Sequence, residues 1–240
     1  MGSGIYFHVT EFFHLTPSEW EAVRLSLFVG LAAVAGSFPF GIFFGWLLAR
    51  KEFPGKSVLD ALLHLPMVIP PVVTGYILLI LFGRKGVLGG FIYDIFGFTF
   101  AFNWKGAALA SAVIAFPLMV RAIRISMESV DRGLEFAART LGAGRAKVFF
   151  TITVPLSFTG ILAGVVMAFA RSLGEFGATI TFVSNIPGET RTLPLALYSQ
   201  LQVPGGEFGA ARLCVVALII AFASMIFSEY LARRNRKKYD

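Results

Sequence analysis

Between two long apolar segments the chain reads Glu135-Phe136-Ala137-Ala138-Arg139-Thr140-Leu141-Gly142-Ala143-Gly144-Arg145. This stretch is part of a charged segment, Arg121–Lys147, that holds six Lys and Arg and three acidic residues. A charged side chain at the centre of a bilayer costs at least ~2.5 kcal/mol. The segment therefore cannot cross a membrane, and its basic surplus places it on the cytoplasmic side.

The composition indicates a polytopic membrane protein, because 56% of the 240 residues are hydrophobic and only 15% are charged. The net charge of +7 does not require a nucleic-acid partner. Fourteen of the 21 Lys and Arg fall in three clusters, which are Arg50–Lys56, Arg121–Lys147 and Arg233–Lys238. Membrane topology explains these clusters, since all three would lie on one side of the membrane.

The apolar runs predict an all-α integral membrane fold with five transmembrane helices, at about 22–49, 59–82, 106–125, 155–182 and 210–232. Residues 1–20 are expected outside or on the membrane surface, and residues 21–240 form a single transmembrane domain. The N-terminus is then outside and the C-terminus cytoplasmic. The segment 83–103 is expected to be an outer loop, and Leu193–Leu201 a helix too short to span.

The cytoplasmic loop, at about 128–154, has the composition of a short helix followed by a turn. Asp131 is a good N-cap, and Ala137 and Ala138 favour helix. Gly142 and Gly144 permit a sharp change of chain direction. Pro155 suits the first turn of the next helix, where its missing N–H costs nothing.

The second apolar run is interrupted by prolines in the tract His64–Gly75. Each proline removes a backbone hydrogen bond, and irregular backbone at membrane depth is tolerated only against protein or beside a watery cavity. The candidates for a pathway or gate here are Pro66, Pro70, Pro71 and Thr74. A plain packing kink is the alternative.

A second candidate for the pathway or gate lies in the fourth apolar run, at Arg171, Ser172, Glu175 and Thr179. Arg171 and Glu175 are four residues apart and can pair on one helix face. They form either a structural salt bridge or part of a gate or pathway wall that faces an anion. Gly41 with Gly45, and Gly160 with Gly164, have the spacing of close helix contacts.

The sequence lacks the usual catalytic patterns: there is no Gly-x-x-x-x-Gly-Lys-[Ser/Thr] phosphate loop and no zinc-binding His-Glu-x-x-His. Cys214 is the only cysteine, and the three histidines have no ligand-like spacing. We therefore predict no catalytic site, no metal site and no bound cofactor.

The cytoplasmic loop resembles the EAA loop of ABC-importer permease subunits at Glu135, Ala137, Ala138, Gly142, Ile152 and Pro155, with Val154 where Leu is usual. The resemblance implies a coupling helix that docks on a separate ATPase subunit, which binds ATP and Mg. It implies that the ATPase contacts involve Glu135, Ala137, Ala138, Leu141, Gly142, Ala143 and Gly144.

Longer tracts are similar to the molybdate permease family, above all Ala170–Thr192, Pro117–Arg124 and Pro204–Glu207. This resemblance implies the type I importer fold, a homodimer in a bacterial or archaeal cytoplasmic membrane, and two ATPase subunits (ModC-like). It also implies an external binding protein (ModA-like) and transport of molybdate, with tungstate as a further substrate. A sulfate/thiosulfate permease, a stand-alone ion-coupled transporter and an intramembrane hydrolase are the alternatives.

Overall fold

The computed structural model describes residues 14–236, and these residues form helices without strands. Three helices are long and apolar enough to cross a membrane: α2 (Pro17–Arg50), α6 (Trp104–Glu128) and α13 (Glu207–Arg236), the last by its stretch Glu207–Phe227. Two bent helix pairs raise the number of spans to as many as five. Most of the predicted N-terminal segment 1–20 lies outside the described residues.

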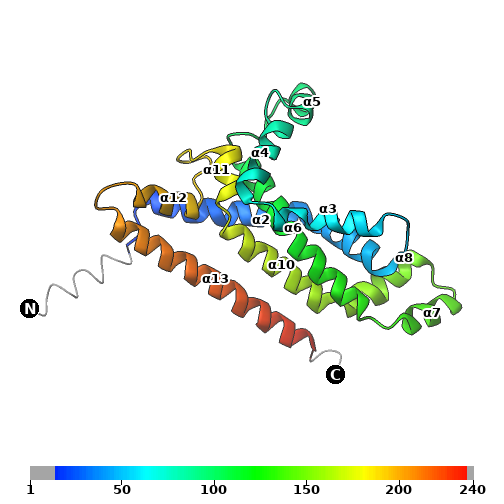
Figure 1. Ribbon diagram of the computed structural model, residues 1–240. Helices are drawn as coiled ribbons and strands as arrows, with labels where there is room; N and C mark the ends of the chain where they lie inside the picture. Colours follow the sequence, from blue (N-terminus) through cyan, green and yellow to red (C-terminus); the bar gives the residue numbers. More distant parts are fainter. Residues whose placement is uncertain (1–13, 237–240) are drawn as a thin grey trace, which may run out of the picture.

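Helix α6 is the centre of the bundle. In its most apolar stretch 61% of the residues are buried, against 11% for α13. It packs most extensively against α2 and α10 (Phe158–Leu173) (Figure 1). A Cβ atom on Gly45 of α2 would lie 2.6 Å from Ile123 of α6, and one on Gly160 of α10 would lie 2.1 Å from the Cβ of Ser126. The small residues therefore allow the close helix contacts that the sequence predicts.

The first bent pair is α3 (Lys56–Val68) and α4 (Pro71–Phe82), and the chain bends by 113° between them. The bend falls at Ile69, which is extended, and at Pro70, whose φ of −55° and ψ of 136° are not helical. Two consecutive prolines remove two N–H groups and force the preceding residue out of the helical region. Pro66 lies inside α3, so the predicted irregular tract His64–Gly75 was too wide.

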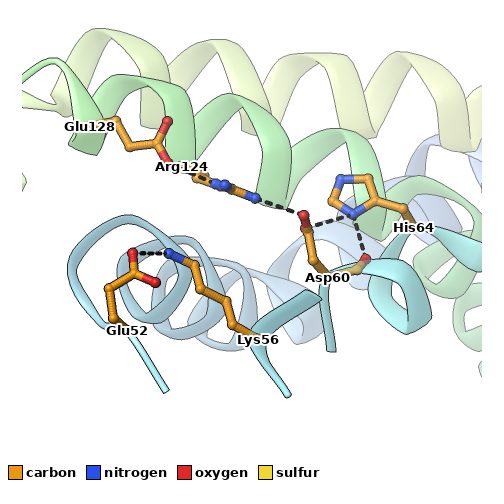
Figure 2. Close-up of polar contacts among 6 residues, drawn as sticks. All are labelled: Glu52, Lys56, Asp60, His64, Arg124 and Glu128. Atoms are coloured by element: carbon orange, nitrogen blue, oxygen red, sulfur yellow. Dashed lines mark hydrogen bonds and ion pairs between the residues drawn. The ribbon is translucent and has the colours of Figure 1, made fainter. Parts of the chain in front are cut away.

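Helix α3 has no fully buried residue, and charged contacts connect it to α6 (Figure 2). Asp60 of α3 accepts from Arg124 Nη1 of α6 at 2.9 Å, and Arg124 also donates to Glu128 at 2.8 Å. The His64 Nδ1 atom lies 3.2 Å from Asp60 Oδ1. Polar contacts, more than apolar packing, therefore hold α3 in place.

The second bent pair runs from Arg145 to Leu173. It begins with α8 (Arg145–Val148), continues through the π-helical turn η1 (Phe149–Thr153) and α9 (Val154–Leu156), and bends by 70° into α10. Pro155 lies in the first turn of α9, as the sequence predicts, but the predicted start of this span at 155 was wrong, because the helical segment begins ten residues earlier. The wider π turn directly before Pro155 accommodates its missing N–H, and Ser126 Oγ donates to the Ser157 carbonyl at the bend, at 3.1 Å.

The predicted span 155–182 is broken a second time, because α10 ends at Leu173 and three residues separate it from α11 (Gly177–Val183). The expected loop 83–103 was also wrong in part, since it contains α5 (Val87–Phe96). That helix is apolar and aromatic, and it stops at Gly97, whose φ is +70°.

The short helices occupy the ends and one side of the bundle (Figure 1). Helix α12 (Leu193–Leu201), which the sequence predicts, lies at one end. Helix α7 (Arg132–Thr140) and α8 lie at the opposite end, while α4, α5 and α11 project from one side. Helices α7 and α8 thus place the charged segment that follows α6 at one end of the bundle.

We expect Gly160→Ala to destabilise the bundle, because its Cβ would overlap the Cβ of Ser126 and the α6 backbone would have to shift. Overpacking of this kind costs ~1–3 kcal/mol, measured as a lower thermal midpoint of the solubilised protein. Gly36→Ala is the matched control, because no atom lies within 4 Å of its new Cβ. An equal loss in both variants would contradict the packing argument.

Candidate functional site

Helix α7 forms as the sequence predicts. Asp131 caps its start and accepts from the Gly133 N–H at 2.8 Å. At its other end Gly142 has a φ of +84°, the left-handed conformation that favours glycine. Gly144, by contrast, has a φ of −65° and precedes α8 as its N-cap residue. Of the two glycines expected at this turn, only Gly142 needs to be glycine for its backbone conformation.

Glu135 connects α7 to the membrane helices. Its carboxylate accepts from Arg50 at the end of α2, at 3.1 Å from Nε and 2.9 Å from Nη2, and from Thr153 Oγ1 in η1 at 2.7 Å. Arg50 Nη2 also donates to the Val130 carbonyl at 3.0 Å. The side chains of Arg50 and Glu135 are only 7% and 12% exposed. A buried charge pair is stable only when hydrogen bonds satisfy its remaining groups, and Thr153 and Val130 provide them.

Residues three and four apart share a helix face, and α7 has two different faces. The inner face carries Arg132, Glu135, Phe136 and Arg139, which line a cavity against the end of α2. The opposite face carries the apolar residues Leu134, Ala137, Ala138 and Leu141.

Leu141 is 89% exposed and Leu134 is 49% exposed. An exposed apolar stripe on an otherwise polar helix is typical of a protein docking surface. Of the predicted ATPase contacts, Ala137, Ala138 and Leu141 lie on this outer face. Gly142, Ala143 and Gly144 form the turn beside it. Glu135 lies on the inner face, where it positions α7.

The proline-rich break brings α4 against α11. A Cβ on Gly75 would lie 2.5 Å from the Ala178 carbonyl oxygen, and one on Gly177 would lie 2.9 Å from Pro71. Thr74 on α4 and Thr179 on α11 are both buried. Pro66 lies apart from this contact, on α3. The structure therefore groups Pro70, Pro71, Thr74 and Thr179 and leaves Pro66 outside the group.

Arg171 and Glu175 form the predicted ion pair, with 2.9 Å between Arg171 Nη2 and Glu175 Oε2. Glu175 does not lie on the same helix, because α10 ends at Leu173. Its other oxygen accepts from the Ala178 N–H at 2.9 Å, so Glu175 caps the start of α11. The Glu175 side chain is 1% exposed and that of Arg171 is 34% exposed. The pair thus joins α10 to α11 across the break.

Three buried hydroxyl groups beside these breaks, those of Thr74, Ser172 and Thr179, have no hydrogen-bond partner within residues 14–236. A buried hydroxyl without a partner costs free energy. Such groups mark places where a polar group from elsewhere can bind.

Sequence reasoning missed the functional contacts of Arg50 and Thr153. Arg50 followed by Lys51 indicates the end of an apolar span, and no local pattern shows that its partner lies 85 residues away. The ion pair between Glu19 and Arg212, at 2.7 Å, was missed for the same reason. In the described part of the chain, no three His, Cys, Asp or Glu residues are grouped as a metal site would require.

Comparison with known proteins identifies a family over residues 38–237, described as binding-protein-dependent transport system inner membrane component. The chain is 64% identical to the molybdenum transport system permease protein ModB of Escherichia coli, over 93% of this chain and 98% of that protein. It is 58% identical to ModB of Haemophilus influenzae, over 92% and 96%. The sulfate transport system permease protein CysW of Synechococcus elongatus is 35% identical, over 90% and 76%.

Solved importer structures share the fold. A bacterial ABC transporter involved in the import of alginate matches with a TM-score of 0.73 and 17% identity, over 95% of this chain and 83% of that chain. An inward-facing form of the MetNI methionine ABC transporter matches with a TM-score of 0.65 and 13% identity, over 98% and 99%.

We expect Glu135→Ala to loosen α7, because it leaves the Arg50 guanidinium buried without its carboxylate. Breaking a buried ion pair costs ~3–5 kcal/mol, which hydrogen exchange would show as lost protection across residues 130–153. The control is Glu128→Ala, which removes a more exposed partner of Arg124 and should cost only ~0–1 kcal/mol. Unchanged protection in the Glu135 variant would contradict the positioning role.

Proposed function

The chain belongs to the family of binding-protein-dependent transport system inner membrane components, and we propose that it is the permease subunit that carries molybdate in an ATP-driven importer. The observation that supports molybdate is the much higher identity to molybdenum permeases than to sulfate permeases. Tungstate, a tetrahedral dianion of the same kind, is proposed as a second substrate. The chain is a multi-pass protein of the inner membrane.

Permeases of ABC importers work with a separate ATPase subunit and a periplasmic binding protein. For this chain we propose two ModC-like ATPase subunits, a ModA-like binding protein and a homodimer of the permease. ATP and Mg would then be bound by the ATPase, with no cofactor held by this chain. The exposed apolar face of α7, around Leu134 and Leu141, supports an ATPase docked at this end of the bundle.

In the proposed mechanism α7 is the coupling helix. When the ATPase subunits close on ATP, they move α7 through its outer face. Glu135 passes that movement to two places at once, to the end of α2 through Arg50 and to η1 through Thr153. Because η1 leads through the bend at Ser157 into α10, a movement of α7 changes the position of α10 relative to α6. The spans would then face outward, and hydrolysis would return them inward.

The proposed pathway passes the breaks in the helices, where Thr74, Ser172 and Thr179 present hydroxyl groups and Arg171 provides a positive charge. Hydroxyl groups donate hydrogen bonds to an oxyanion, but these bonds are weaker than those from a charged side chain. A pathway built mostly from hydroxyls therefore binds its anion weakly and releases it. Specificity then lies with the external binding protein.

We also propose that the N-terminus lies outside and the C-terminus in the cytoplasm. This orientation places α7, α8 and the clusters Arg50–Lys56 and Arg121–Lys147 in the cytoplasm, as the distribution of basic residues favours. Helix α12, at the other end of the bundle (Figure 1), then lies on the outer side, where the binding protein docks.

The test of this function is ATP hydrolysis in liposomes that contain this chain and its ATPase, with the binding protein added. We expect stimulation by binding protein loaded with molybdate or tungstate and little by sulfate. Equal stimulation by sulfate would leave the importer class intact and overturn the substrate. Anion uptake without the ATPase would favour a stand-alone transporter and overturn both.

The coupling role of α7 is tested by Gly142→Ala, which forces a side chain into a left-handed conformation at a cost of ~1–2 kcal/mol. We expect uptake to fall while the ATPase remains active, because the turn that orients α7 is disturbed. Gly144→Ala is the matched control, since Gly144 has an ordinary φ and neither glycine has an atom within 4 Å of a new Cβ. Normal uptake by the Gly142 variant would count against the coupling role.

A further inference from the structure

A cavity of about 160 Å³ lies between the inner face of α7 and the end of α2. Figure 1 shows the end of the bundle at which α7 and α8 lie. Its lining includes five basic residues: Arg50, Lys51, Arg132, Arg139 and Arg145. A single water takes up about 30 Å³ in the liquid, so the cavity has room for a small polyatomic ion. Arg50, Glu135 and Thr153 of its lining make the coupling contacts proposed above, whereas its other four basic residues have no part in the proposed transport steps.

The charge of the cavity is strongly unbalanced. Glu135 is the only carboxylate in its lining, and Arg50 already neutralises it at 2.9 Å. Within residues 14–236, the other four basic residues make no ion pair with a carboxylate. Two of them lie over aromatic rings instead, Lys51 at 5.6 Å from Trp46 and Arg139 at 5.9 Å from Phe136. Arg50 is largely buried, and the other four basic residues are exposed around the mouth of the cavity. Clustered charges of one sign attract an ion of the opposite sign.

The geometry favours a small anion over the ATPase as the occupant. The cavity faces inward, toward α2 and η1, whereas the apolar stripe suited to a protein partner is on the opposite face of α7. Arg50 is a rigid part of the cavity, since its side chain is 7% exposed. Its Nε and Nη2 donate to Glu135 and Val130, and Nη1 has no acceptor among the described residues. Nη1 is therefore the one nitrogen of Arg50 that can donate to an anion in the cavity, beside the guanidinium groups of the other arginines.

The aromatic residues in its lining indicate that this cavity lies near the boundary between membrane and water. Trp46 and Phe149 line it with their rings 5.9 Å apart, and tryptophan is enriched where membrane and water meet. Basic pockets at the cytoplasmic ends of spans bind the head groups of anionic lipids. A phosphate group of a lipid and a free tetrahedral oxyanion present the same chemistry to these arginines.

We propose that this cavity is a binding site for a phosphate-like tetrahedral oxyanion, provided either by an anionic phospholipid head group or by a free anion of the cytoplasm. The anion contacts the basic groups of α2, α7 and α8 together and so fixes α7 against α2. The site is separate from the transport pathway, and it does not depend on which anion is imported.

The experiment uses the purified permease–ATPase complex. The test variant is Arg139→Gln with Arg145→Gln. The control is Arg121→Gln with Lys147→Gln, which removes the same charge from exposed residues outside the cavity. Lys51→Gln is a milder test variant in case the first one fails to fold. Free anions are probed by the thermal midpoint in sodium phosphate and in sodium molybdate at constant ionic strength. Lipid is probed by native mass spectrometry of complexes from nanodiscs with phosphatidylglycerol or phosphatidylcholine.

We expect a saturable rise of the midpoint with a free anion, or selective retention of phosphatidylglycerol. The cavity variant should weaken that binding by about tenfold or more, as expected for the loss of two charged donors, while the control retains it. The first result identifies a free anion as the source and the second a lipid, and either supports the site.

The proposal is overturned if the complex binds neither probe, or if both double variants lose binding equally. It is also overturned if the cavity variant loses the ATPase subunit but keeps its anion binding, because the basic residues would then serve the protein partner. Anion binding here together with failed molybdate-stimulated ATP hydrolysis would reject the transport proposal and leave this one standing.

Discussion

The position of α7 depends on the buried carboxylate of Glu135. A nine-residue helix with polar ends has too little apolar surface to hold itself against a membrane bundle. Its two flanking connections leave it free to pivot, and the contacts of Glu135 with Arg50 and Thr153 remove that freedom. Because these two partners belong to separate membrane segments, one side chain gives α7 a fixed relation to both. A partner that pushes on the outer face of α7 therefore moves the spans along with it.

Within the membrane the chain departs from regular helix at three places, at Ile69–Pro70, at Ser157 and at Gly174–Phe176. Broken backbone at this depth has to be satisfied by neighbouring protein. The Ser157 carbonyl accepts from the Ile161 N–H and also from Ser126 Oγ, and Glu175 accepts from the first turn of α11. The breaks also leave hydroxyl groups without partners, at Thr74, Ser172 and Thr179. The same irregularity that bends the helices thus leaves the hydroxyl groups from which the proposed pathway is built.

Local chemistry predicted the parts of the structure that depend on neighbours in sequence. The Asp131 cap, the turn at Gly142 and the short helix Leu193–Leu201 follow from capping, backbone conformation and length. The extents of the broken spans did not follow, since Pro66 is tolerated inside α3 and a π turn carries the helix through Pro155. Contacts between distant segments, such as Arg50 with Glu135 and Asp60 with Arg124, have no local signature. An arginine after an apolar run indicates topology whether or not it also has a buried partner.

The two faces of α7 suit two different kinds of partner, a protein on the outer face and a small anion on the inner face. An apolar stripe with Leu141 almost fully exposed suits a protein that closes over it, because burial of apolar area requires a large complementary surface. A group of arginines around a small cavity suits a small anion, because their charges of one sign add up there. The 160 Å³ cavity is far too small to admit a protein surface. In the proposed mechanism an anion bound there would act on the same helix as the ATPase, so the occupancy of the cavity and the movement of α7 would be linked in both directions.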